Sequence, residues 1–462
     1  IIEGDEPMLN DLSLGKNEKD MIEHGIVEME NELSMDRMAA IADMRYQYIE
    51  EITQKAVVRP KTDKHHDKTI KIDNILTHKI FGIPIFLSIM FAIFWLTFAV
   101  VGSFLSDLLS GGIDSLASVV SKGLNNFGIN PVVESLVVDG VFAGVGSVLS
   151  FVPTIIVLFF LLSLLEDSGY MARVAFIMDK LLRKIGLSGK SIVPMLIGFG
   201  CTVPAIMATR TLTSDRDKKM TVFLTPFMSC SAKLPIYSVF AMAFFTKYRA
   251  VVMIAMYVIG ILLAIVAALI SRKFVFKGNP IPFVMELPNY RLPTAKNTML
   301  LLWEKTKDFI TRAFTIIFIA SIVIWFLNKF DIRFNAVENS KDSILALIGS
   351  FIAPIFIPLG FGNWMASTAL ITGFMAKEAV VSTFAVLLST QTESISSQLG
   401  TIFDPISAFA FLLFTLLYTP CVAAIAAVKR ELGTKSMFVV VLLQTSLAYA
   451  IALIFYRIAI LF

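Results

Sequence analysis

The stretch "GFGCTVPAIM", residues 198–207, lies in one of the most apolar regions of the chain, yet it contains residues that break helices. Its glycines add backbone freedom, and its proline removes a hydrogen-bond donor and clashes with the preceding turn. In hydrocarbon a broken helix persists only where protein or a water-filled cavity pairs the freed backbone groups. We therefore predict a membrane segment that unwinds around Cys201.

The composition indicates a membrane protein rather than a soluble one. The chain has 462 residues, of which 56% are hydrophobic and 16% charged, and its mean hydropathy is +0.75. Soluble proteins carry about 25% charged residues. The apolar runs reach the roughly 20 residues that a crossing helix needs, and no alternating pattern of an outer-membrane barrel appears. The sequence therefore predicts an all-α polytopic membrane protein, and a net charge of +4 gives no sign of a nucleic-acid partner.

The cysteines and the histidines lie in different parts of the chain. The three cysteines are Cys201, Cys230 and Cys421, all in or beside apolar runs, and an odd number there argues against a disulfide framework. The four histidines precede the first apolar run; they are His24, His65, His66 and His78. The membrane region therefore offers thiols but no imidazole.

Residues 1–78 form a charged region ahead of the first apolar run. Apolar residues recur there at helical spacing, as at Ile22, Ile26 and Met29, which predicts a small soluble helical bundle. Basic residues separate the bundle from the first crossing, so we place the bundle in the cytoplasm. The chain begins without an initiator methionine or a signal peptide, and we therefore expect a piece of a longer protein.

The rest of the chain divides by charge and by proline content. We assign residues 79–135 to the first transmembrane helix and an external loop, and residues 136–277 to a first repeat. A Pro-rich cytoplasmic loop occupies residues 278–307, and a second repeat occupies residues 308–462. Both repeats are expected to contain broken helices.

The charges on either side of the opening stretch require it to turn back. Lys190 precedes it and Arg216 follows it, each in a basic cluster, and basic segments stay in the cytoplasm. A full crossing would place one cluster outside, whereas a re-entrant hairpin that turns at residues 198–204 keeps both inside. We therefore predict a broken, re-entrant element.

The second half repeats the order of crossing, broken element, interrupted crossing and crossing, with helix breakers at "PLGFGNW", "MAKEAV" and "YTPC". Its flanks at residues 331–342 and 391–404 lack a basic bias and are placed outside, which indicates an inverted-topology repeat. Paired broken helices in such repeats point to a transport site near the bilayer midplane. Glycine and proline are also simply common in membrane helices, but two breaks in register favour the transport site.

Sulfur and hydroxyl groups gather near the breaks, in "FMSCSAKLP" at residues 227–235 and in "LLYTPCVAA" at residues 416–424. Sulfur suits soft or borderline metals, iron among them, while carbonyls and hydroxyls complete a weakly bound shell. A single cysteine is as readily a small buried hydrophobe, but all three fall at breaks. The predicted metal contacts are Cys201, Cys230, Cys421 and Met228, and the predicted pathway residues are Gly198, Gly200, Pro204, Ser229, Ser231, Lys233, Tyr418, Thr419 and Glu378.

Ionisable residues inside the apolar runs are further candidates, because each costs roughly 2.5 to 3.5 kcal/mol at a helix centre. Lys233, Lys377 and Glu378 meet this description. Lys233 would favour a nearby thiolate but would repel a cation. Glu166 and Asp167 end an apolar run, where they either cap the helix in solvent or line an exit, and the sequence leaves both possibilities open.

The sequence "IGLSGKS", residues 185–191, is similar to a phosphate-binding loop. The GxxxxGK[ST] pattern needs a glycine five residues before Gly189, and that position is Lys184. We therefore expect no nucleotide site in this chain.

Four motifs give the chain a family resemblance: "GFGCTVPAIMATRTL", "TPFMSCSAKLPIYSVFA", "GFMAKEAVVSTFAV" and "LLYTPCVAAIAAVKREL". Together with "IADMRYQYIEEI" ahead of "DNILTHKIFGIPIFL", they resemble the ferrous iron transport protein B family of prokaryotic inner membranes. The resemblance covers nearly the whole chain, in order. It implies two gate domains similar to those of nucleoside transporters, Fe2+ as the transported ion, and an N-terminal G-protein domain joined through a helical spacer.

The resemblance also implies roles for residues and partners. Cys201 and Cys230 match the cysteines of the family's gate motifs, and Cys421 matches that of the second gate. Only the spacer is expected here, at about residues 1–75, so GTP dependence would belong to the longer parent protein. The implied activity is transport rather than an enzyme reaction, in a multi-pass inner-membrane protein with a cytoplasmic N-terminal bundle. The implied partners are membrane lipid, small cytoplasmic accessory proteins and further copies of the chain.

Two other classes of protein stay open. A nucleoside or other small-solute transporter would share the repeats, but its breaks would show more amide and carboxylate groups than sulfur. A membrane-embedded signalling or assembly protein would explain the N-terminal bundle, but not the paired breaks.

Overall fold

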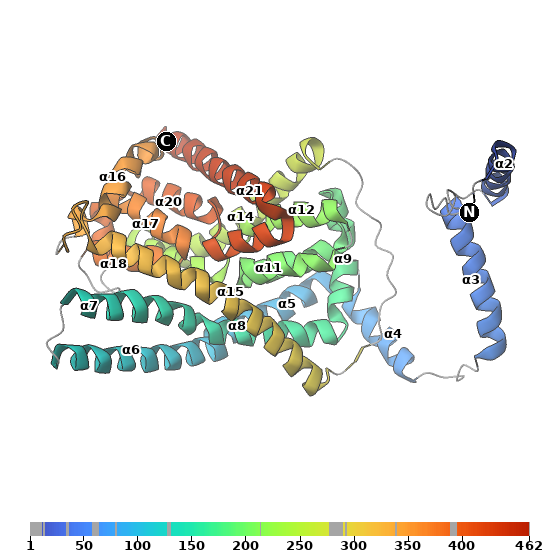
Figure 1. Ribbon diagram of the computed structural model, residues 1–462, viewed down its shortest axis with the longest axis horizontal. Helices are drawn as coiled ribbons and strands as arrows, with labels where there is room; N and C mark the ends of the chain where they lie inside the picture. Colours follow the sequence, from blue (N-terminus) through green and yellow to red (C-terminus); the bar gives the residue numbers. More distant parts are fainter. Residues whose placement is uncertain are drawn as a thin grey trace. The chain divides into compact units, whose positions relative to one another are not determined.

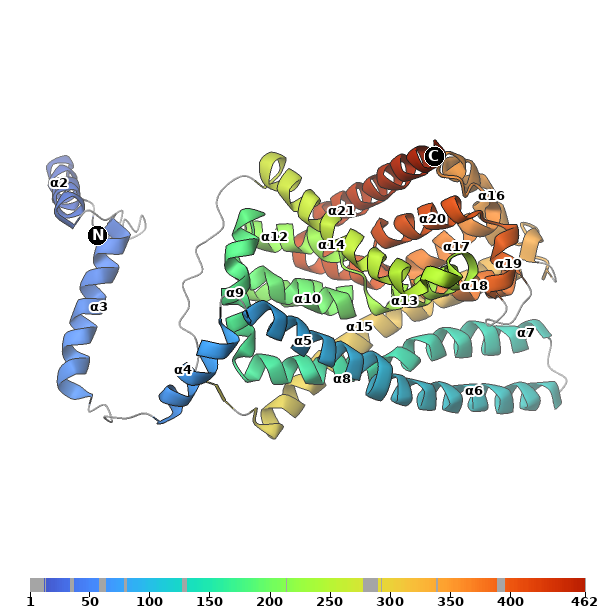
Figure 2. The same cartoon turned by 180° about the vertical axis from the view of Figure 1, so that it is seen from behind.

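A computed structural model of the chain (Figure 1, Figure 2) describes residues 12, 14–33, 37–57, 64–78, 81–126, 131–212, 214–276, 290–291, 293–337, 340–388 and 395–461. Regular structure in these residues is helical, apart from one isolated bridge between Phe330 and Ala336. The chain divides into two units, Ile1–Lys68 and Thr69–Phe462. The predicted all-α class is confirmed.

The first unit contains α2 (Lys16–Leu33) and α3 (Arg37–Ala56), which pack against each other. Ile26 and Ala40 are buried. Ile22 and Met29 are half-buried, as the helical spacing predicts. The next helix, α4 (Lys64–Leu76), continues past the division into the second unit.

The first membrane helix is much longer than the sequence suggests. α5 (Gly82–Trp95), the π-helical η1 (Leu96–Val101) and α6 (Gly102–Asn126) follow one another without a break. The external loop predicted before residue 135 is therefore largely helical, and the short α7 (Pro131–Ser135) follows it. Apolar residues in α6 recur at helical spacing, and the helix packs along α8 (Ala143–Asp167), which follows η2 (Leu136–Phe142). Packing on α8 thus outweighs the poor helix propensity of glycine and serine in α6.

In the first repeat the predicted re-entrant hairpin is present. α9 (Tyr170–Lys184) is bent by 81° from the end of α8, and α10 (Ile192–Gly200) and α11 (Thr202–Ala208) pack against each other on either side of Cys201. Arg216 then donates a hydrogen bond from Nη1 to the carbonyl of Gly186 over 2.9 Å. The chain therefore enters and leaves the hairpin at the same end of the helical unit.

The first repeat ends in three helical runs. α12 (Asp215–Leu224) continues into η5 (Thr225–Phe227), and the chain then unwinds before η6 (Ser231–Lys233) and α13 (Leu234–Phe244). α14 (Arg249–Phe274) closes the repeat. Residues 278–289 and 292 of the predicted Pro-rich loop lie outside the described residues, and residues 295–307 are helical, as the start of α15 (Ala295–Lys329).

The second repeat has the same alternation of helices and breaks. Its elements are α15 (Ala295–Lys329), α16 (Ile344–Phe356), η9 (Ile357–Leu359), α17 (Trp364–Met375), α18 (Ala379–Leu387), α19 (Ile395–Gln398), α20 (Pro405–Leu417) and α21 (Val422–Ala459). The run ending in η9 is bent by 104° from α17. Gly360 makes this turn with φ of 84°, a conformation that other residues rarely adopt. A second positive φ, at Gly433, kinks α21.

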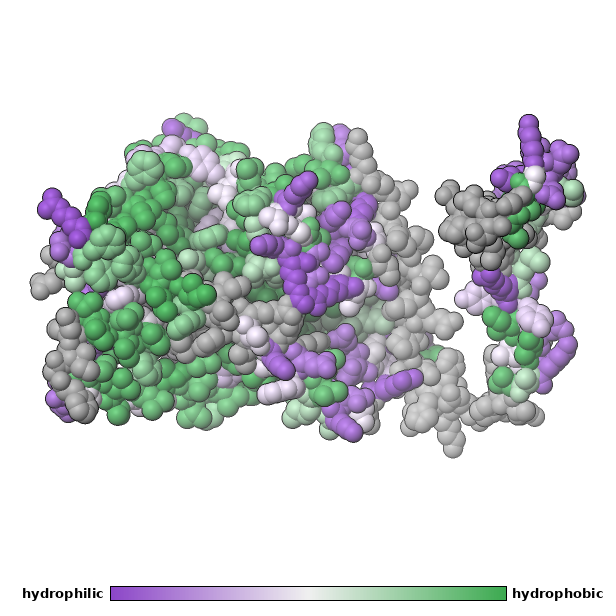
Figure 3. All heavy atoms as spheres, in the orientation of Figure 1, coloured by the Kyte–Doolittle hydropathy of each residue, from purple (hydrophilic) through white to green (hydrophobic). Residues whose placement is uncertain are grey.

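The second unit has the surface of a membrane protein. Among the described residues, four helices are long and apolar enough to cross a membrane, or six if each of two bent pairs counts as one span. Hydrophobic side chains cover much of the visible face of this unit in Figure 3. Large apolar side chains such as Phe91, Phe351 and Leu442 point outward with 71%, 84% and 65% of their surface exposed. An exposed apolar surface of this extent requires lipid around it.

Candidate functional site

The first break has a counterpart in the second repeat with almost the same backbone. Cys201 ends α10 with φ of −150° and ψ of 133°, and Ala376 ends α17 with φ of −144° and ψ of 128°. Each is preceded three residues earlier by the Gly-Phe pair of "GFGC" or "GFMA". Each backbone N–H still bonds the carbonyl four residues before it, of Ile197 or Thr372. Both helices therefore stop in the same way, as an internal repeat requires.

The second pair of breaks is also extended. Cys230, just before η6, has φ of −74° and ψ of 161°. Tyr418, just after α20, has φ of −64° and ψ of 162°, and Cys421 has φ of −59° and ψ of 157°. Residues 228–230 and residues 418–421 thus form two further unwound segments, one in each repeat.

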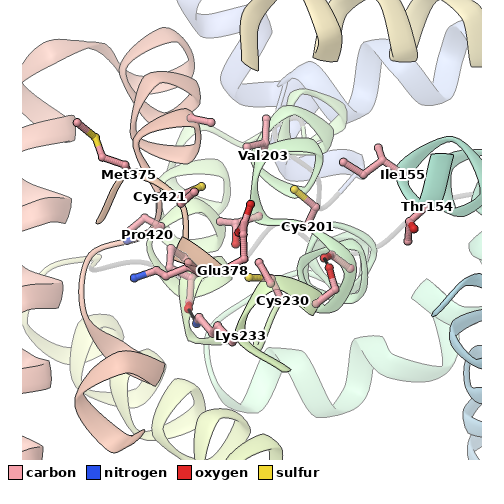
Figure 4. Close-up of a pocket in the computed structure, with 18 residues that line it drawn as sticks. Thr154, Ile155, Cys201, Val203, Cys230, Lys233, Met375, Glu378, Pro420 and Cys421 are labelled. Atoms are coloured by element: carbon pink, nitrogen blue, oxygen red, sulfur yellow. Dashed lines mark hydrogen bonds between the residues drawn. The ribbon is translucent and has the colours of Figure 1, made fainter. Parts of the chain in front are cut away.

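All four breaks border one cavity of about 110 Å³ (Figure 4), room for several water molecules. Cys201, Cys230 and Cys421 line it, together with Glu378. In Figure 4, Glu378 stands among the three thiols. The other lining residues are Thr154, Ile155, Gly200, Thr202, Val203, Pro226, Ser231, Ala232, Lys233, Met375, Ala376, Lys377, Pro420 and Ala423.

The thiols face the cavity because of their place at helix starts. Cys201 is the N-cap of α11, Cys230 of η6 and Cys421 of α21, and Glu378 is the N-cap of α18. An N-cap side chain points past the free end of its helix, and here four such ends converge. Among the described residues, however, no three His, Cys, Asp or Glu side chains are close enough to hold a metal ion together. The thiols share a cavity but do not form a closed metal site.

Several predicted site residues lie beside the cavity rather than on its wall. Met228 and Ser229 are buried, and the Ser229 hydroxyl lies 3.1 Å from that of Tyr237. Tyr418 and Thr419 are also buried, and only Pro420 and Cys421 of their segment reach the wall. Gly198 and Pro204 lie within α10 and α11, away from the lining, whereas Gly200 and Ser231 are on it.

Glu166 and Asp167 lie apart from this cavity. Both are exposed at the end of α8, and neither is among the residues that line the cavity. The Thr298 hydroxyl donates a hydrogen bond to Asp167 over 3.3 Å. Of the two possibilities that the sequence leaves open for this pair, the solvated helix end fits its position.

The structure adds cavity residues that the sequence analysis missed. Met375 lines the cavity at the end of α17, although its side chain extends away from the three thiols in Figure 4. Thr154 on α8 and Thr202 on α11 contribute hydroxyl-bearing side chains to the wall. Met375 and Thr202 each lie next to a break. Adding one residue on either side of each break to the candidates would therefore have included them. Thr154 is far from any break in sequence, so only the packing of α8 reveals it.

An apolar layer and a group of charges close one side of the cavity. Along α11 and α21, Val203 and Ile206 pack with Ala424 and Val428, and Cys201 and Cys421 lie at the edge of this layer. Beyond it, Glu431 on α21 accepts a hydrogen bond from Nε of Arg210 over 2.7 Å and from Nζ of Lys218 over 3.3 Å. The cavity is therefore closed on this side by an apolar layer followed by a charged one.

Three family models match the chain. A model described as "Nucleoside recognition", named Gate, matches residues 148–244 and 310–435, which hold every residue that lines the cavity. A model described as "Ferrous iron transport protein B C terminus" matches residues 253–305, and one described as "FeoB cytosolic helical domain" matches residues 1–58. No solved structure matches the chain.

Curated relatives carry the same family name. A protein of Staphylococcus aureus (strain MSSA476) named "Fe(2+) transporter FeoB" is 43% identical over 91% of this chain, which spans 63% of that relative's length. One of Methanocaldococcus jannaschii with the same name is 39% identical over 92% of the chain and 64% of its own length. The relative from Campylobacter jejuni is 40% identical over 90% of the chain and 69% of its own length. The chain thus belongs to the ferrous iron transport protein B family.

Proposed function

We propose that this chain is the membrane-spanning part of an Fe2+ transporter, in which the ion crosses at the cavity between the two gate repeats. The observation that carries the proposal is that Cys201, Cys230 and Cys421 line one cavity, each at a helix break. Sulfur ligands suit a borderline metal such as Fe2+. The names of the relatives and the model of the ferrous iron transport protein B C terminus support the same cargo.

The geometry suits an ion that stops briefly and leaves. A closed site of several thiolates would trap the ion, whereas ligands spread around a cavity can replace its water one at a time. Cys201 and Cys421 offer sulfur, Glu378 offers carboxylate oxygens, and Ser231 offers a hydroxyl that now donates to the carbonyl of Gly200 over 3.0 Å. Each thiol that binds Fe2+ releases one proton, so uptake depends on pH.

The setting of the transporter is part of the same proposal. The N-terminal helices, matched as a cytosolic domain, would lie in the cytoplasm of a prokaryote, with the second unit in its inner membrane. A relative from Porphyromonas gingivalis, 37% identical, is named as a fusion of Fe(2+) transport protein A with the transporter. A small accessory protein of that kind is therefore the partner we propose, and GTP would act through parts of the longer parent protein.

A nucleoside or small-solute transporter is the second candidate, because the gate model is described by nucleoside recognition. The cavity argues against it. Its wall has no asparagine or glutamine among the lining residues, and its volume of about 110 Å³ is below the 300–1,000 Å³ typical of small-molecule pockets. Base and sugar hydroxyls would find few partners there.

Uptake into sealed proteoliposomes separates the two candidates. The chain without substitutions, called the parent below, is expected to load Fe2+ into vesicles under anaerobic conditions. Excess uridine should not compete with this uptake. Cys201→Ser keeps the size of the side chain and removes the soft ligand, and it should reduce uptake strongly, as should Cys230→Ser. Met256→Leu, which removes a buried sulfur in the core of α14, is the matched control and should leave uptake unchanged. Uptake at the parent rate in Cys201→Ser, Cys230→Ser and Cys421→Ser would exclude the thiols as ligands.

A further inference from the structure

Two buried lysines line the cavity, and both ammonium groups bond backbone carbonyls. Lys233 is 3% exposed, and its Nζ donates to the carbonyl of Pro226 over 3.2 Å and to that of Leu416 over 2.7 Å. Lys377 is 2% exposed, and its Nζ donates to the carbonyl of Thr419 over 2.8 Å. Both ammonium groups thus bind backbone carbonyls, whereas the sequence suggested that Lys233 would favour a nearby thiolate.

The carbonyls that the lysines bind are those that a broken helix leaves without partners. Leu416 is in the last turn of α20, where the final carbonyls have no intrahelical donor. These carbonyls carry the partial negative charge of the helix end. Leu416 and Thr419 are buried and do not line the cavity, so the break needs a donor from the protein, and a cation is the donor best matched to that charge.

The two lysines reach the same unwound segment from different repeats. Lys233, on the first repeat, binds Leu416 just before the segment, and Lys377, on the second, binds Thr419 within it. The ammonium of Lys377 also lies 3.1 Å from the ring centroid of Tyr418, between these two attachment points. Cys421 follows two residues later and faces the cavity.

We infer that Lys233 and Lys377 are positioning residues that clamp the backbone between α20 and α21, so that Cys421 stays on the cavity wall. Their charges neutralise helix ends and are not ligands or counter-ions of the thiols. The inference rests on the proposed function only where it concerns Fe2+, since the clamp itself is a feature of the backbone. It also explains how a cation pathway tolerates two lysines, because carbonyl oxygens partly offset each charge.

Hydrogen–deuterium exchange tests the clamp directly, on the full chain in detergent and without metal. In Lys377→Met, which keeps the length of the side chain and removes its charge and donor, amides in residues 414–424 should exchange at least about tenfold faster. Lys233→Met should do the same, and should also speed exchange in residues 226–232. The hairpin of α10 and α11 should stay within about twofold of the parent in Lys377→Met. Lys341→Met, at an exposed lysine of η8 (Ser340–Asp342), is the matched control and should change neither region.

Two results would overturn the inference: unchanged exchange over residues 414–424 in both variants, or an equal increase over the whole second unit, which signals general loss of stability. Where a methionine variant does not fold, Lys377→Gln and Lys233→Gln are measured against the same limits, because glutamine keeps a neutral donor on a shorter side chain.

Fe2+ uptake by the same variants separates this inference from the proposed function. Faster exchange over residues 414–424 with uptake at the parent rate would leave the clamp standing and refute a transport role for Cys421. Unchanged exchange with lost uptake would refute the clamp and leave the proposed function intact.

Discussion

A buried ion pair ties α4, ahead of the first membrane helix, to the first gate repeat. The side chain of Arg173 on α9 is fully buried, and it donates from Nε and Nη2 to the two carboxylate oxygens of Asp73 over 3.0 and 3.1 Å. The hydroxyl of Tyr290 donates to the same carboxylate over 2.8 Å, and its ring lies 4.3 Å from the guanidinium carbon. Burial, together with the hydrogen bond to Asp73, raises the pKa of Tyr290, so it remains a donor at physiological pH.

Replacing Asp73 by alanine should destabilise the second unit severely. The buried guanidinium would keep its bond to the carbonyl of Gly169, at 3.1 Å, but would lose both charged contacts. Breaking a buried pair by removing one partner costs about 3–5 kcal/mol. Asp73 is 19% exposed, so solvent screens part of the interaction and we expect the lower end, about 3 kcal/mol. Asp73→Asn keeps one acceptor oxygen and should cost less.

The assay is thermal unfolding of the purified chain in one detergent at one scan rate, because membrane proteins often unfold irreversibly. Arg183→Gln is the matched control: it removes an ion pair with Asp179 on the same helix, but Arg183 is 40% exposed and the pair should contribute under about 0.5 kcal/mol. The double variant Asp73→Leu with Arg173→Met should recover much of the loss, since an apolar pair needs no charge compensation. A midpoint for Asp73→Ala as high as that of Arg183→Gln would refute the reasoning.

Three further predictions concern pH, the charged group at Glu431 and the packing of α14. Fe2+ uptake into proteoliposomes should weaken as pH falls from neutral to mildly acidic, because thiols must lose protons to bind the ion; uptake independent of pH would argue against thiolate ligands. Glu431→Gln should loosen the contacts of η4 (Thr209–Thr211) and α12 with α21 and speed labelling of Cys201 by a thiol reagent added on the Glu431 side, with little loss of stability because Arg210 is 42% exposed; equal labelling rates would place the closure elsewhere. Gly260→Ala should lower stability by about 1–3 kcal/mol, since the added Cβ would lie 2.7 Å from the carbonyl of Phe227, whereas Gly112→Ala meets nothing within 4 Å and should be neutral or stabilising; equal melting temperatures would contradict the close approach.

The position of each break could be read from the sequence, because helix breakers act on their own neighbourhood. Gly200, Cys201 and Pro420 lie at or next to unwound backbone, where the residue types predict it. Convergence of the three cysteines followed from one further step, the register of the two repeats. The sequence did not indicate which side chains near a break face the cavity. Met228, two residues from Cys230, is buried beside the cavity wall instead of on it.

Long-range partners were beyond the sequence for a physical reason. Arg173 reads as one more basic residue of a cytoplasmic segment, and nothing near it in sequence indicates that it meets Asp73, one hundred residues earlier. The helix of α6 was missed for a similar reason, since its glycines and serines suggest a loop and only its packing on α8 favours a helix. Pairing of buried groups and packing of whole helices are decided by the fold, not by local residue preference.

The lysines show how the two kinds of information combine at the cavity. Sequence alone places Lys233 three residues after Cys230 and suggests a charge pair with sulfur, which a transported cation would have to break. In the structure the ammonium group of Lys233 instead donates a hydrogen bond to the carbonyl of Leu416, 183 residues away. A helix break creates unpaired carbonyls at one end and free N–H groups at the other. Lysine binds the first, and the N-cap position turns Cys421 toward the space left by the second, so one break both positions the thiol and directs the ammonium group to carbonyl oxygens that partly offset its charge.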